Sequence, residues 1–124
     1  MSEFKGEVKT LWLKNPKADR KMQLLEDFSF IDSEGKTWTS VKGSIVDGAS
    51  IPKYLWTIGG SPFSGNYRRA SVIHDTECKL KERPHKDVHK VFYEMMLEDH
   101  VPKWKAKLMY NMVRTFGPKW KLKS

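Results

Sequence analysis

Hydrophobic and polar positions follow two different periods along this chain, and the period changes near Ser50. Before that residue, short runs at 8–13, 22–31 and 36–45 are rich in β-branched and aromatic residues, and apolar positions alternate with polar ones within them. Such alternation predicts strands with one covered and one wet face. Turn residues at 32–35 predict a hairpin between the second and third runs. We therefore expect a small antiparallel β-sheet, a hairpin or meander, in the first half.

After Ser50 the apolar residues recur every three or four positions, which is the spacing of one face of an α-helix. One stripe consists of Val88, Val91, Phe92, Met95 and Met96. A second consists of Trp104, Leu108, Met109, Met112, Val113 and Phe116. Helix breakers separate these stripes from a helical segment at 64–80 and stop the last helix at Gly117. The second half is thus predicted to contain three helices, preceded by a short helical piece at 51–58 and a Gly-rich loop.

Length and composition agree with a single α+β domain over residues 1–124. The chain has 124 residues, of which 39% are hydrophobic, and this is enough for one core but not for two. We expect a β-rich lobe at 7–48, a helical lobe at 51–117 and a basic tail at 118–124. The single cysteine, Cys78, excludes an internal disulfide framework and indicates a reducing compartment. With no signal peptide or membrane span visible, we expect a location in a cytoplasm.

The charge of the chain favours anionic partners. The formal net charge is +8 and the pI is about 9.6, which suits a membrane surface, nucleic acid or an acidic protein. No acidic residue follows Asp99. Basic residues gather in this C-terminal part, and the candidate contacts to an anionic partner are Lys103, Lys107, Arg114, Lys119 and Lys121. Three interpretations fit this pattern: a helix that binds a membrane surface, a surface that binds nucleic-acid phosphates, and a solvated charged face over core residues.

The dipeptide His74-Asp75 is the strongest candidate for chemistry. On the segment 64–80, helical spacing places Tyr67, His74 and Cys78 on one side, and His89 lies at the margin of the stripe on the following helix. If the two helices pack antiparallel, the two imidazoles come within hydrogen-bond reach, with Asp75 beside them at the mouth of the site. The alternative is structural: His74 is a satisfied core residue, and Asp75 pairs with a neighbouring Arg69, Lys79 or Lys81.

Two further sets of residues extend this hypothesis. In the segment 47–52, Asp47 and Ser50 suit a turn and a helix cap, but they can also reach the His74 site and support a substrate. A metal site is a second chemical option. The side chains of His74, Asp75 and His89, with Asp47 or His85 added, form a two-His-plus-carboxylate set that suits Zn²⁺, Mn²⁺ or iron. Such a site hydrolyses esters or phosphates through a bound water.

A series of motifs resembles a family of small phage and prophage proteins catalogued as a domain of unknown function. In order, they are Asp47-Gly48-Ala49-Ser50-Ile51-Pro52, Leu55-Trp56, Tyr67-Arg68-Arg69-Ala70, Ile73-His74-Asp75, Phe92-Tyr93-Glu94-Met95-Met96, Leu108-Met109-Tyr110, Val113-Arg114 and Phe116-Gly117. The resemblance extends from about Val8 to Gly117. It implies a phage or prophage origin, and association with the virion is compatible with it.

A narrower resemblance is chemical. The helix pair that carries 74–78 and 88–96 is similar to that of the secreted phospholipases A, especially the bacterial ones. This resemblance implies that His74 is a general base, that Asp75 binds Ca²⁺, and that carbonyls of the Gly60 loop complete the calcium site. His89 stands where those enzymes carry an orienting Asp, and Cys78 stands where they carry a supporting Tyr.

Together these patterns predict a phage-derived, hydrolase-like protein that acts on an ester or phosphoester of an anionic substrate. His74, Asp75 and His89 are the predicted catalytic residues. The alternative is a non-enzymatic phage accessory protein that binds nucleic acid or a host protein through its basic C-terminal helix. A virion or assembly component is the third possibility.

Overall fold

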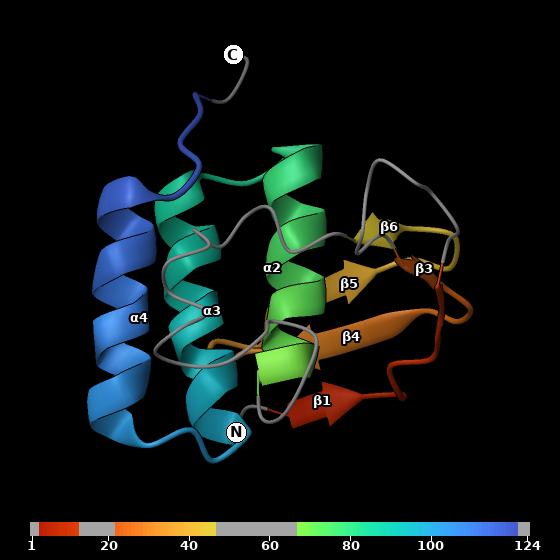
Figure 1. Cartoon of the computed structure of the whole chain (residues 1–124), viewed down its shortest axis with the longest axis horizontal. Coiled ribbons are helices and arrows are strands. Elements are labelled where there is room, and N and C mark those ends of the chain that lie inside the picture. Colours follow the sequence, from red (N-terminus) through yellow and green to blue (C-terminus); the bar gives the residue numbers. More distant parts are fainter. Residues whose placement is uncertain (1–2, 13–21, 47–66, 122–124) are drawn as a thin grey trace.

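A computed structural model describes residues 3–12, 22–46 and 67–121 of the protein, and it has the predicted α+β fold (Figure 1). Strands form one side of the described structure and helices form the other (Figure 1). The predicted helical piece at 51–58 and the glycine pair after it lie outside the described residues. The order of strands followed by helices agrees with the change of period near Ser50.

Six short strands form two three-stranded antiparallel sheets. The first sheet has the order β1-β4-β5, with β1 (Glu3–Lys5), β4 (Phe28–Ile31) and β5 (Thr37–Ser40). The second sheet has the order β2-β3-β6, with β2 (Thr10–Trp12), β3 (Met22–Leu24) and β6 (Ile45–Val46). The predicted hairpin is present, because β4 and β5 pair with Phe30 opposite Trp38.

The run at 22–31, expected to be one strand, is divided between the two sheets. Leu25, Glu26 and Asp27 are exposed and separate β3 from β4. The carboxylate of Asp27 accepts a hydrogen bond from the backbone N–H of Lys42 at 2.6 Å, which fixes the bend. Two adjacent acidic residues cannot enter an apolar sheet face without partners, so the chain turns at this point.

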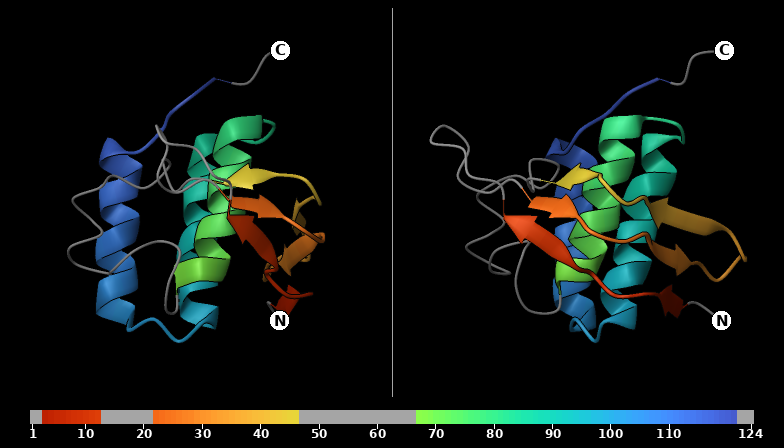
Figure 2. Two further views of the ribbon diagram at one scale, coloured as in Figure 1. Left: turned by 45° about the vertical axis from the view of Figure 1, so that its right-hand side comes forward. Right: turned by 90° about the vertical axis from the view of Figure 1, so that its right-hand side faces the viewer.

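The helices form a layer against the strands, with α3 between α2 and α4 (Figures 1 and 2). Their bounds are α2 (Arg68–Leu80), α3 (His85–Glu98) and α4 (Lys103–Phe116). Lys81 ends α2 in the left-handed conformation, with φ 55°, and its N–H bonds to the carbonyl of Glu77. Pro84 and Pro102 precede the two later helices, where their fixed φ suits a helix start. Among the helices that the structure describes, none combines the length and apolar composition that crossing a bilayer requires.

The core lies between the strands and the helix layer. Phe28 and Phe30 of β4 are fully buried, as their alternation predicted, and Ile73, Phe92 and Met95 meet them from the helices. Helix α2 is the central element, since it contacts β4, β5 and β6 on one side and α3 on the other. It is therefore buried from Ala70 to Cys78, polar residues included, rather than along one stripe.

Asp32 organises the β4–β5 hairpin. Its carboxylate accepts hydrogen bonds from the indole N–H of Trp38 and from the backbone N–H groups of Glu34 and Lys36, each at 2.9 Å. Burial alone raises the pKa of Asp32, but these hydrogen bonds and the charge of Lys36 together lower it below its ordinary value. The carboxylate thus stabilises the fold above its ordinary pKa of 3.8. This contribution is lost as the pH falls through the lowered pKa.

We expect Asp32→Asn to destabilise the protein by about 1–3 kcal/mol at pH 7, because the amide cannot accept all three hydrogen bonds. Urea unfolding followed by tryptophan fluorescence measures this difference, with Glu34→Gln at an exposed neighbouring side chain as the control. The difference should shrink at a pH below the lowered pKa of Asp32. Equal stability of the wild type and Asp32→Asn at pH 7 would show that the prediction is wrong.

Candidate functional site

His74 of α2 and His89 of α3 meet across the seam between the two helices. Both side chains have 0% exposure, and the distance between His74 Nε2 and His89 Nδ1 is 2.9 Å. The short connection through Pro84 makes the two helices antiparallel (Figure 1). The expected contact between the two histidines required antiparallel packing of these helices. The structure has this packing, and it brings the two residues together.

The backbone of Pro118 determines the hydrogen-bond direction in this pair. Its carbonyl oxygen lies 2.8 Å from His89 Nε2, and a carbonyl can only accept, so His89 donates through Nε2–H. In the neutral ring, His89 Nδ1 then carries the lone pair and accepts from His74 Nε2–H. The basic nitrogen of a neutral His74 is consequently Nδ1.

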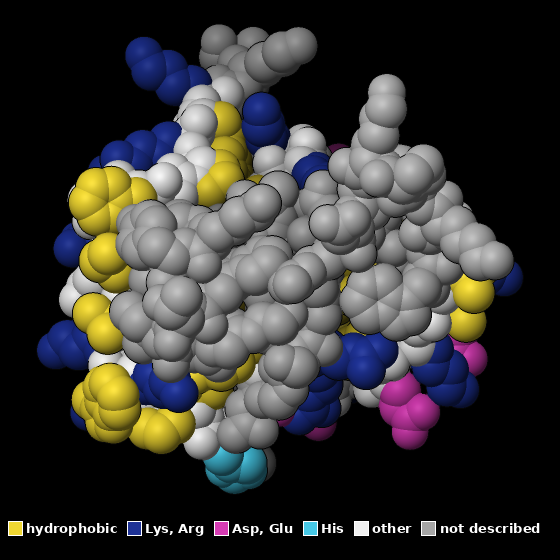
Figure 3. Space-filling view, in the orientation of Figure 1, with side chains coloured by type: hydrophobic (Ala, Val, Ile, Leu, Met, Phe, Trp, Pro, Cys, Tyr) yellow, Lys and Arg dark blue, Asp and Glu magenta, His cyan; other side chains and the backbone are white. Residues whose placement is uncertain are grey.

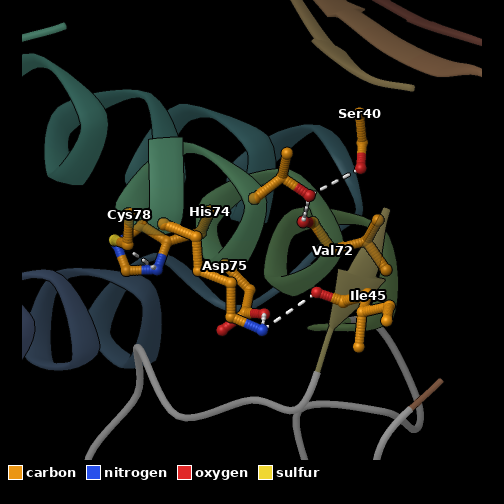
Figure 4. A network of polar contacts seen from close by, with 8 residues as sticks. Ser40, Ile45, Val72, His74, Asp75 and Cys78 are labelled. Carbon is orange, nitrogen blue, oxygen red and sulfur yellow. Dashed lines mark hydrogen bonds and ion pairs between the residues drawn. The ribbon is translucent and has the colours of Figure 1, made fainter. Parts of the chain in front are cut away.

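Cys78 lies one helical turn after His74. Its Sγ is 3.9 Å from His74 Nδ1 and 3.8 Å from Nε2, and the thiol is buried (Figure 4). The Phe92 ring packs against the His74 ring with a centroid distance of 4.5 Å. Among the described residues, the side chains of this cluster are thus two imidazoles and a thiol, packed against the Phe92 ring.

Both imidazoles favour the neutral form. Burial, followed by the proximity of His89, lowers the pKa of His74 well below its ordinary 6.5. Burial also lowers the pKa of His89; the hydrogen bond to Pro118 opposes this, and His85 and Lys119 add to it. A proton that enters the pair is better placed on His89, since its second N–H already has a carbonyl acceptor.

One ligand atom from each of His74, Cys78 and His89 lies within 4.8 Å of the other two. Tetrahedral Zn²⁺ places two ligand nitrogens about 3.3 Å apart and a nitrogen and a sulfur about 3.6 Å apart. The corresponding distances here are 2.9 Å between the two nitrogens and 3.8 Å between Sγ and His74 Nε2. Opening the histidine pair by a few tenths of an ångström would bring the His74–His89 distance to the zinc value, and the His74–Cys78 distance is already close to it. A set of two nitrogens and one sulfur does not suit Ca²⁺, which prefers oxygen.

The Asp75 side chain is not beside the histidine pair, where we expected it, but on the side of α2 that faces β6. Its Oδ2 is 3.3 Å from Lys79 Nζ, and the same ammonium donates to the carbonyl of Ile45 in β6 at 2.9 Å. Figure 4 shows the Asp75 side chain directed towards β6 and the His74 ring directed towards Cys78. Asp75 therefore forms one of the pairs that its helical spacing offered, but in a buried position, and it is not among the three clustered ligands.

The remaining predicted site residues have different positions. Tyr67 is buried at the N-terminal end of α2, two turns before His74. Asp47, Ser50 and Gly60 lie outside the described residues.

The candidate anion contacts Lys103, Lys107, Arg114, Lys119 and Lys121 are all exposed. Basic and apolar side chains alternate along the edge of the molecule that α4 forms (Figure 3).

Sequence reasoning did not find Pro118 and Trp120 as parts of this site. The Trp120 ring lies 6.1 Å from that of His89 and 5.8 Å from that of His85, and its indole N–H donates to the carbonyl of Arg83 at 2.8 Å. The contribution of Pro118 is a backbone carbonyl, which leaves no signature in a residue type. Trp120 stands among lysines in the sequence, and this composition predicted a basic tail rather than a segment that packs against α3.

Two proteins of Sinorhizobium fredii (strain NBRC 101917 / NGR234) are similar to this chain. The uncharacterized protein y4jT is 50% identical over 102 residues, which is 82% of this chain and 30% of that protein. The uncharacterized protein y4iH is 44% identical over 97 residues, which is 78% of this chain and 41% of that protein. This chain thus spans less than half the length of these relatives. No solved structure matches it.

A family model described as "Protein of unknown function (DUF1353)" matches residues 22–113. The match includes both sheets from β3 onward, the histidine pair and most of α4. Because it covers most of the sequence, the chain belongs to the DUF1353 family.

Proposed function

We propose that this protein is a hydrolase in which His74 is the general base, and that it acts on an ester or phosphoester of an anionic substrate. The observation that carries this proposal is the 2.9 Å hydrogen bond between the two imidazoles, together with the Pro118 carbonyl that orders it. A lone buried histidine has no route for the proton it accepts, whereas this one is linked to a second ring.

The proposed proton path follows from the tautomers. His74 Nδ1 takes a proton from water, the oxygen of that water attacks the ester carbon or phosphorus, and the Nε2 proton of His74 moves to His89 Nδ1. The charge then rests on His89, whose Nε2–H donates to Pro118. The leaving-group oxygen is protonated when the path reverses. His89 accepts the proton here, where the phospholipases that the helix pair resembles use the charge of an Asp. Because both rings are fully buried, the reaction also requires a local opening beside His74.

We assign Asp75 a positioning role in this proposal. Its ion pair with Lys79, and the bond from Lys79 to the Ile45 carbonyl, connect α2 to β6 one residue away from the base. A net charge of +8 supports an anionic substrate. An origin in a phage or prophage, taken from the motif resemblance, remains part of the proposal.

Zn²⁺ hydrolysis is a second candidate, favoured by the His74–Cys78–His89 cluster. Three protein ligands and one open position are typical of catalytic zinc. In that case the metal would occupy the two nitrogens that now share a proton, and it would lower the pKa of a bound water instead. The two routes exclude each other in one molecule. The calcium site implied by the phospholipase resemblance needs Asp75 and Gly60, and it stays a prediction.

We expect His74→Gln to reduce hydrolysis by at least about 100-fold, because glutamine keeps an N–H donor towards His89 but is not a base. His89→Asn should reduce it similarly, since its oxygen can accept the bond from His74 but cannot take the proton. Turnover is measured on lipid esters, phosphodiesters and phosphomonoesters, with thermal unfolding as the check on folding. The matched control is His100→Asn, at an exposed position with φ 65° that asparagine tolerates.

Turnover of His89→Asn at the wild-type rate would overturn the proton path. If the folded wild-type protein hydrolyses none of these substrates, the hydrolase proposal fails. The non-enzymatic roles in binding nucleic acid, a host protein or a virion then remain.

Chelation separates the two hydrolytic routes. The proton path predicts full activity in EDTA, whereas the zinc route predicts loss of activity that Zn²⁺, and not Ca²⁺ or Mn²⁺, restores. For the zinc route, Co²⁺ should give a sulfur-to-cobalt charge-transfer absorption that disappears in Cys78→Ser. Full activity in EDTA and no such absorption would exclude zinc. Restoration by Ca²⁺ alone would instead support the oxygen-ligand site at Asp75.

A further inference from the structure

A basic pocket opens on the surface where α3 begins and α4 ends. It has a volume of about 540 Å³ and is lined by His85, Lys86, Tyr110, Arg114, Thr115 and Lys119. Three of these six side chains are cations and none is a carboxylate. The three cations are Lys86 on α3, Arg114 on α4 and Lys119 just after α4. The packing of α3 against α4 therefore brings their charges into one pocket.

The chemistry of the lining suits a phosphoryl group. Arginine and lysine donate charge-assisted hydrogen bonds to phosphate oxygens, and the hydroxyl group of Tyr110 adds a neutral donor, whereas the Thr115 hydroxyl already donates to the Asn111 carbonyl. Tyr110 is held by the Tyr93 ring at a centroid distance of 5.5 Å. The start of α3 contributes as well. His85 and Lys86 are its first two residues, so the pocket lies at the positive end of this 14-residue helix, where Asp87 of the first turn offsets part of that charge.

The pocket adjoins the histidine pair. The His85 ring forms part of its wall and lies 5.9 Å from the His89 ring, measured between centroids. Lys119 directly follows Pro118, whose carbonyl binds His89, and its charge contributes to the lowered pKa of His89. Only the His85 ring therefore separates a ligand in this pocket from His89 of the buried pair.

We infer that this pocket anchors the phosphoryl group of a small anionic ligand next to the histidine site. Its use in catalysis rests on the proposed function, but the binding does not. The convergence of cations in a concave place favours a single phosphoryl group over an extended polyanion. The other basic residues of α4, Lys103 and Lys107, lie towards the opposite end of that helix and do not line the pocket. The source of the group is either a soluble phosphate ester or a lipid headgroup.

Calorimetry with inorganic phosphate and phenyl phosphate tests the inference at physiological salt. We expect the double variant Arg114→Gln/Lys119→Gln to bind at least about tenfold more weakly than the wild type, because it loses two charge-assisted contacts. The matched control is Lys103→Gln/Lys107→Gln, which removes the same charge from the first half of α4, away from the pocket, and should change binding less than about twofold. Equal weakening in both variants would mean diffuse attraction and would overturn the inference.

Sedimentation with phosphatidylcholine vesicles, with and without phosphatidylglycerol, tests the second source. Binding that needs the anionic lipid and falls only in the Arg114/Lys119 variant supports the pocket with a headgroup as its ligand. Absence of specific binding in both calorimetry and sedimentation overturns the inference. His74→Gln should retain phosphate binding, so a failure of the hydrolase proposal and a failure of the pocket would be seen separately.

Discussion

The burial of α2 on both sides is the constraint on which the site depends. From Ala70 to Cys78, α2 is enclosed by strands and by α3, so its buried polar side chains are stable only with internal partners; the described residues supply none for the Ser71 hydroxyl. Thr76 donates to the Val72 carbonyl and accepts from Ser40, Asp75 pairs with Lys79, and His74 bonds to His89. The histidine pair is thus one of several internal solutions to the same problem. Unlike the others, it joins two groups that can exchange a proton.

The pair also connects the interior of the molecule to its surface. From His74, the hydrogen bonds lead through His89 to the carbonyl of Pro118, and the next residue is Lys119 in the basic pocket. The chain after α4 therefore completes both the buried pair and the surface pocket. This gives the residues at 118–121 a structural reason to pack on α3 rather than extend as a tail.

Helical spacing was sufficient to place His74, Cys78 and His89 near one another, because residues three and four apart share a face and apolar stripes identify which faces meet. It was not sufficient for Asp75. The side chain after His74 points about a quarter turn away from it. Only the tertiary structure shows that the Asp75 carboxylate pairs with Lys79 beside β6. The division of the run at 22–31 between two sheets could not be predicted either, because β-propensity does not indicate which strand pairs with which.

The sequence by itself determined the α+β class, the hairpin at 32–35, the three helices and the faces that carry the histidines. These follow from local periodicity and from turn and helix-breaking residues, which act over a few positions. The tertiary structure alone decided that α2 is enclosed from Ala70 to Cys78, that a carbonyl of Pro118 sets the direction of the imidazole hydrogen bond, and that Lys86, Arg114 and Lys119 converge. Those features depend on contacts between distant segments and on backbone groups, and neither leaves a local pattern in the amino-acid sequence.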